Sequence, residues 1–192
     1  MSNDTFDADE RRRKAEEAAK KPMAAAPMKF DEQGNVDWGN MWDSFCALAL
    51  TGGPSHRETA LLPELSCNPD SEAYRRASSE IIRGIFLVSG LKATPDRTGW
   101  IAVEADSEGM AEWIAKAAEA EHVLFRSDGA RFFVPCGENY QTKIEVKSVI
   151  TVVAKTTHYW QDHVANEMKA AFVLEDTIDK VGSTLKRMFG RK

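Results

Sequence analysis

The segment "HVLFRSDGARFFVPC", residues 122–136, constrains the fold most, because two β-rich runs meet at an Asp-Gly pair. Asp-Gly between such runs is a strong signal for a tight β-hairpin turn, since glycine accepts a positive φ. We therefore expect strands near residues 123–127 and 130–134, with Gly129 in the left-handed region. The chain must accordingly contain an antiparallel pair of strands.

Helical periodicity precedes this hairpin at two places. Apolar residues recur at three-and-four spacing in a first helix, which Gly52-Gly53-Pro54 should end; they are Trp38, Met41, Trp42, Phe45, Leu48 and Ala49. A second helix is predicted to start at Asn68-Pro69-Asp70, since Asn can cap and Pro suits the first helical position. Ser89-Gly90 should end it. The N-terminal half is thus expected to supply two helices.

A strand and a helix are expected between residues 100 and 118. The segment "WIAVEA", residues 100–105, is short and apolar, as is typical of a strand. Asp106 or Ser107 can cap a following helix, whose apolar side runs from Met110 to Ala118. The middle of the chain therefore predicts strand, helix and hairpin in that order.

Residues 142–181 contain neither glycine nor proline. Within them, "KIEVKSVITVVAK" at residues 143–155 fits both an alternating strand and a helical stripe. We favour a helix, because the pattern continues to about Gly182 without a turn signal, although the β-branched content favours a strand.

Together these elements predict an α+β fold. Two N-terminal helices would pack on a small β-α-β-β-α unit with a long C-terminal helical segment. Residues 1–27 read as a disordered charged tail and linker, because they have no apolar stripe and end in "PMAAAP". Residues 28–181 would form a single globular domain, followed by a basic C-terminal tail at 182–192.

Composition favours a soluble, cytoplasmic protein. The 192 residues suit one ordinary domain, and the net charge of -5 argues against a dedicated nucleic-acid binder. No apolar run is long enough to span a membrane, so no transmembrane segment is expected. Three cysteines, Cys46, Cys67 and Cys136, are an odd number that fits free thiols in a reducing compartment.

The most distinctive candidate site is the segment "GGPSHR", residues 52–57. Gly52 and Gly53 allow close approach of the backbone, whose N–H groups can form an anion-binding concavity. Ser55 adds a hydroxyl, His56 adds a group that titrates near neutral pH, and Arg57 adds a fork for carboxylate or phosphate. The alternative is a simple turn, because Gly and Pro most often mark turns.

A second candidate is "THYWQDH", residues 157–163. His158 and Asp162 share a helical face, so the carboxylate could orient the imidazole. Trp160 supplies aromatic surface that could cover a ligand. The alternative is that the aromatic residues belong to the core and the histidines to the surface.

No metal site is predicted, since the histidines and cysteines lack ligand spacing; a site assembled from distant His and Cys residues stays open. The sequence does not identify a cofactor; a carboxylate-bearing aromatic cofactor such as a tetrapyrrole would suit Arg, His and Trp together. A small anionic ligand or a protein is the expected partner. The basic C-terminal tail also leaves weak peripheral membrane contact open.

Our leading functional hypothesis is an accessory or binding protein that holds a small anionic ligand at the loop of residues 52–57. Two alternatives remain. One is an enzyme in which His56 or His158 is the general acid or base and Arg57 anchors the substrate. The other is a protein–protein interaction module with exposed tryptophans. Convergence of His56, Arg57 and His158 on one concave site would favour the first two readings.

Overall fold

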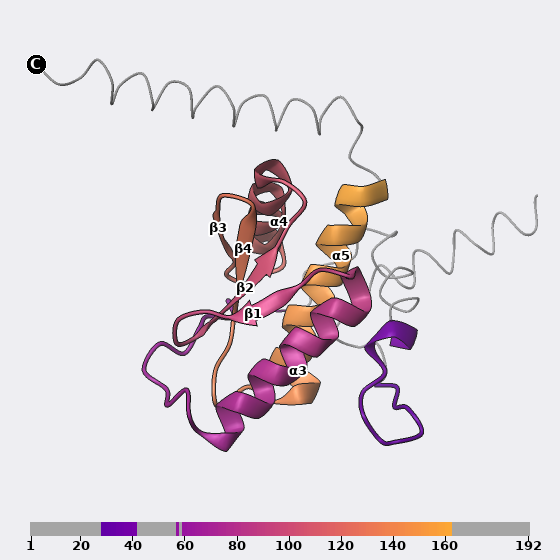
Figure 1. Ribbon diagram of the computed structural model, residues 1–192, viewed down its shortest axis with the longest axis vertical. Helices are drawn as coiled ribbons and strands as arrows, with labels where there is room; N and C mark the ends of the chain where they lie inside the picture. Colours follow the sequence, from indigo (N-terminus) through magenta and orange to yellow (C-terminus); the bar gives the residue numbers. More distant parts are fainter. Residues whose placement is uncertain (1–27, 42–56, 58, 163–192) are drawn as a thin grey trace, which may run out of the picture.

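The computed structural model of the chain describes residues 28–41, 57 and 59–162 (Figure 1). Residues 38–41 are helical, in agreement with the start of the first predicted helix. The rest of that helix, the loop residues 52–56, the predicted tail at 1–27 and everything after Asp162 lie outside the described residues. Within the described part, none of the helices is both long and apolar enough to cross a membrane.

The sheet confirms the α+β class and adds a strand that we did not predict. It contains β1 (Ala93–Pro95), β2 (Trp100–Glu104), β3 (Arg126–Asp128) and β4 (Arg131–Pro135). All neighbours pair antiparallel, in the order β1-β2-β4-β3. The predicted β-α-β-β-α unit is therefore preceded by a further edge strand. We did not predict β1, because it is three residues long and ends in proline. Such a segment shows no alternation of apolar and polar residues.

The predicted hairpin forms, with a shift in its strand bounds. Asp128 pairs with Arg131 across β3 and β4, so Gly129 and Ala130 are the two loop residues. Gly129 has φ +58°, which confirms the predicted left-handed position. β3 begins at Arg126 and not at Val123, because Val123 instead forms a parallel bridge with Leu61.

Helix α3 (Glu72–Ser89) begins later than the sequence predicted. Ser71 is the N-cap, and its hydroxyl accepts a hydrogen bond from the Tyr74 amide at 3.1 Å. The Asn68 side chain instead accepts from the Asp70 amide at 3.0 Å, which makes a turn before the helix. The C-terminal prediction is confirmed, since Gly90 has φ +72° and caps the helix.

The remaining helices are α4 (Glu108–Ala120) and α5 (Lys147–Asp162), and α5 decides whether residues 143–155 form a helix or a strand. Ser107 caps α4, as one of the two predicted caps. A single π-helical turn, η2 (Thr142–Val146), leads into α5, so residues 143–155 are helical. Residues on every side of α5 are buried, so tertiary packing outweighs the weak helix propensity of its β-branched residues.

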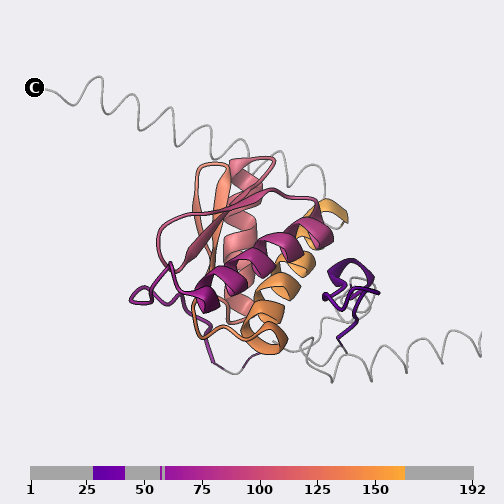
Figure 2. The same cartoon turned by 60° about the horizontal axis from the view of Figure 1, so that its bottom comes forward.

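The molecule has a helical layer on one face of the sheet. Alternate residues of β2 and β4 face the main core together with α3, α4 and α5; they are Ile101, Val103, Phe132 and Val134. Figures 1 and 2 show the three helices gathered on this side. The intervening residues Trp100, Ala102 and Phe133 form a separate, smaller cluster without any helical residue. The second face of the sheet is therefore the place where a site can be built.

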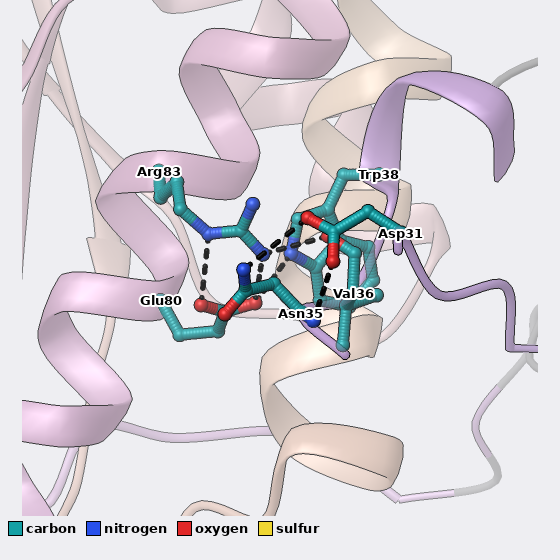
Figure 3. A network of polar contacts seen from close by, with 6 residues as sticks. All are labelled: Asp31, Asn35, Val36, Trp38, Glu80 and Arg83. Carbon is teal, nitrogen blue, oxygen red and sulfur yellow. Dashed lines mark hydrogen bonds and ion pairs between the residues drawn. The ribbon is translucent and has the colours of Figure 1, made fainter. Parts of the chain in front are cut away.

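The N-terminal segment is attached to α3 by a polar network (Figure 3). The indole Nε1 of Trp38 donates to the Glu80 carboxylate at 2.7 Å, and the Arg83 guanidinium donates to the Val36 carbonyl at 2.7 Å. Glu80 and Arg83 also form an ion pair at 2.6 Å. The Trp38 ring is fully buried, so this segment contributes to the main core.

Candidate anion-binding cleft

The second face of the sheet carries two arginines beside two aromatic rings. Cross-strand register places Arg126 opposite Phe133, and Asp128 opposite Arg131. Since residues two apart on a strand share a face, Arg131 and Phe133 lie on the same side as Arg126 and Asp128. The hairpin turn thus brings both guanidinium groups onto one surface.

Each guanidinium group lies over an aromatic ring. The Cζ of Arg126 is 4.7 Å from the centre of the Trp100 ring, and that of Arg131 is 5.4 Å from the centre of the Phe133 ring. Such a contact is a cation–π interaction, and a guanidinium group has five N–H donors, so it can form hydrogen bonds while it lies over a ring. Both arginine residues remain exposed, so a ligand can reach these donors.

A surface cleft of about 370 Å³ runs from the β1–β2 turn to the β3–β4 hairpin. We call it the arginine cleft, defined by the residues that line it: Asp96, Arg97, Arg126, Ser127, Asp128, Arg131 and Phe133. Arg97 and Asp96 stand in the β1–β2 turn, where the Asp96 amide donates to the Trp100 carbonyl. Residues that are far apart in sequence therefore meet because the two hairpins are neighbours in the sheet.

The charges in the arginine cleft are three guanidinium groups and two carboxylates. The Nε of Arg97 and the carboxylate of Asp96 are 4.0 Å apart, which is a loose ion pair, and the Arg97 side chain is 66% exposed. Within the described residues, neither Arg126 nor Arg131 has a carboxylate within 4.0 Å. The stacked arginines are thus positioned by the rings and not neutralised by close acids, which suits them to bind an anion.

Of the loop that the sequence predicts as a site, residues 52–57, the structure describes Arg57. Its Nε donates to the Thr59 carbonyl at 3.2 Å, and its Nη1 donates to the Ser148 hydroxyl at 3.4 Å. Nδ1 of His122 lies 2.5 Å from the Arg57 carbonyl oxygen. Arg57 is therefore held between α5 and the end of α4. Gly52, Gly53, Ser55 and His56 lie outside the described residues, and a site there remains a prediction.

The second predicted cluster lies near the end of α5. Nδ1 of His158 is 3.1 Å from the Asp162 carboxylate, so the predicted pairing on one helical face is present. A carboxylate at this distance can orient the imidazole ring. Trp160 is 6% exposed and packs against Trp113, with ring centres 5.8 Å apart. The Trp160 ring is therefore part of the hydrophobic core of the described structure.

The structure does not bring Arg57 and His158 together. Arg57 contacts Ser148, which lies ten residues before His158 on α5. At 1.5 Å per residue, that interval corresponds to about 15 Å along the helix axis. Both residues also belong to the helical side of the sheet, whereas the arginine cleft lies on the second face.

Cys67 and Cys136 are free thiols. Burial is the main cause that raises the pKa of the Cys136 thiol from 9.0 to about 12, so this sulfur is protonated and unreactive near neutral pH. Among the described residues, no group of three or more His, Cys, Asp or Glu side chains is arranged to hold a metal ion.

Comparisons with other proteins find no matching family model, no similar curated protein and no similar solved structure. The candidate site therefore depends on the geometry of this chain. Sequence reasoning overlooked Arg97, Arg126 and Arg131, although two of them flank the predicted hairpin turn. Extending the hairpin register outward from Gly129 would have placed Arg126, Arg131 and Phe133 on one face.

Proposed function

We propose that this protein binds a small organic anion, with a carboxylate or phosphate group held in the arginine cleft. The observation that supports this function is the pair of exposed arginines, Arg126 and Arg131, each stacked on a ring. Stacking limits the rotamer freedom that binding would otherwise cost, so each guanidinium fork is prepared for a bidentate contact.

The volume of the arginine cleft favours a small molecule over a macromolecule as its ligand. Ligand pockets in proteins span roughly 300–1,000 Å³, and a cleft of about 370 Å³ is at the small end of that range. Binding of single-stranded nucleic acid relies on exposed ring faces for base stacking. Trp100 is 1% exposed and Phe133 is 8% exposed, so their faces are already covered. These features support a metabolite-sized ligand.

The loop of residues 52–57 is a second proposed place for the same class of ligand. Arg57 would anchor the ligand there, as the sequence suggests. Substitutions of the cleft arginines and of Arg57 therefore distinguish the two sites. The free thiols Cys67 and Cys136 favour a soluble accessory protein in the cytoplasm as the setting.

Calorimetric titration of the full-length chain with inorganic phosphate and with glutarate tests this function and locates it. Arg126→Gln and Arg131→Gln should each weaken binding tenfold or more, because each removes a charge-assisted contact. Arg57→Ala tests the loop in the same way. Arg76→Gln is the matched control, since Arg76 is an exposed arginine of α3 that does not line the cleft.

The proposal predicts saturable binding that weakens with added salt and is lost in the cleft variants but kept in Arg76→Gln. Loss of binding in Arg57→Ala alone would move the site to the loop. Absence of saturable binding for both anions at millimolar concentration would refute the proposed function.

A further inference from the structure

We infer that the ligand of the arginine cleft is an acidic amino acid, with one ammonium and two carboxylate groups. This inference rests on the proposed function and adds the chemical class of the ligand. It commits to a free small molecule, because the cleft volume of about 370 Å³ suits one.

The first argument is the position of Asp128. It stands directly opposite Arg131 in the β3–β4 register, where Cβ atoms of cross-strand partners are about 5 Å apart. Opposite charges in such a pair usually attract each other, yet no Asp128–Arg131 ion pair within 4.0 Å forms among the described residues. Arg131 lies over Phe133 instead. The Asp128 carboxylate therefore stays in the cleft as an acceptor for a cationic group.

The second argument is the opposite end of the cleft. Asp96 and Arg97 are adjacent in the β1–β2 turn, and their charged groups are 4.0 Å apart. At this separation and exposure the attraction is weak, so both groups can exchange their contact for one with a ligand. Each end of the cleft thus offers one carboxylate and one guanidinium group, with Arg126 as the additional cation.

The third argument is the balance of charge. Three arginines exceed two aspartates by one positive charge, which an acidic amino acid with a net charge of −1 would neutralise. A plain dicarboxylate would satisfy the arginines but would have no group for Asp96 or Asp128. Repulsion from those carboxylates would then oppose its binding.

A calorimetric comparison of L-glutamate with glutarate, which lacks only the amino group, tests this class. We expect the full-length chain to bind L-glutamate at least tenfold more tightly, because the ammonium adds a charge-assisted contact. Asp128→Asn should remove most of this preference by weakening glutamate while strengthening or sparing glutarate. Asn is tolerated at this turn position, so the variant should fold. Asp106→Asn, an exposed aspartate outside the cleft lining, is the control.

The outcomes separate this inference from the proposed function. Equal affinity for the two compounds, or a preference that survives Asp128→Asn, would overturn the amino-acid ligand and leave the anion site standing. Failure of L-glutamate, glutarate and inorganic phosphate to bind would refute the proposed function itself. A tenfold preference that Asp106→Asn keeps and Asp128→Asn loses would support the inference.

Discussion

The guanidinium carbon of Arg126 in β3 lies 4.7 Å from the centre of the Trp100 ring in β2, although β4 lies between these two strands in the sheet. Trp100 is buried under this contact, while Arg126 stays exposed. The Trp100 ring therefore contributes to the stability of the sheet, and the Arg126 guanidinium forms part of the surface that a ligand can contact.

Replacing these two residues should separate stability from binding. Trp100→Ala should lower the free energy of unfolding by about 3–5 kcal/mol, because it removes a buried ring. Arg126→Gln should lower it by about 1 kcal/mol or less, which is typical of an exposed cation–π contact. Urea unfolding of both variants measures this difference. A larger loss for Arg126→Gln than for Trp100→Ala would mean that the arginine is a structural brace.

The network of Figure 3 predicts that Trp38 and Glu80 are energetically coupled. Trp38→Phe keeps most of the buried ring but removes the 2.7 Å hydrogen bond to the Glu80 carboxylate. We expect a loss of about 2 kcal/mol, in the range of hydrogen bonds to charged groups. Urea unfolding of Trp38→Phe, Glu80→Ala and the double variant forms the cycle, because alanine has no side-chain acceptor for the indole N–H. Strictly additive effects would show that the contact contributes nothing.

Gly129 provides a test of backbone conformation in the hairpin. Its φ of +58° is strained for a residue with a branched side chain, so Gly129→Val should destabilise the protein by about 1–3 kcal/mol. Ala130→Val is the matched control, because Ala130 is the other loop residue and does not have a positive φ. Equal thermal midpoints for the two variants would contradict this account of the turn.

The buried thiol of Cys136 predicts a loss of stability in alkali. Its pKa is about 12 in the folded chain, against an ordinary value of 9.0. Because the folded state holds this proton more tightly, its contribution is complete below pH 9 and falls as the pH rises towards 12, by at most about 4 kcal/mol.

Cys136→Ala tests this contribution, since alanine does not titrate and groups distant from the thiol cancel in the comparison. The difference in unfolding free energy between the wild type and this variant should shrink between pH 9 and pH 10.5, as measured by urea unfolding. A difference that stays constant over this interval would show that the thiol is not shielded in the folded protein.

Local patterns in the sequence predicted much of the fold. The Asp-Gly turn, the Ser107 cap and the Gly90 stop each depend on the chemistry of a few neighbouring residues. The start of α3 was misplaced because Asn68 and Ser71 are both able caps, and local chemistry alone did not choose between them. The preference of residues 143–155 for a helix was confirmed, although their β-branched residues obscured it.

The candidate site was harder to predict because it depends on strand pairing between distant segments. Arg97 and Arg131 are separated by 34 positions in the chain, and they line one cleft only because β2 and β4 are neighbours in the sheet. The exposed side chains of a strand carry no periodic signal beyond their alternation. By contrast, the loop "GGPSHR" attracts attention in the sequence because glycine and proline are conspicuous wherever they cluster.

The most direct test of the central claim is an NMR titration that follows the arginine Nε–Hε signals of the full-length chain. Arg→Lys variants at positions 97, 126 and 131 assign the three cleft signals, and Arg57→Lys and Arg76→Lys assign the loop anchor and the control. Addition of L-glutamate or glutarate should shift the signals of Arg126 and Arg131 saturably, with a single dissociation constant, and leave that of Arg76 unchanged. If the cleft signals stay in place while the Arg57 signal shifts, or if no arginine signal responds to either compound, the arginine cleft is not the binding site.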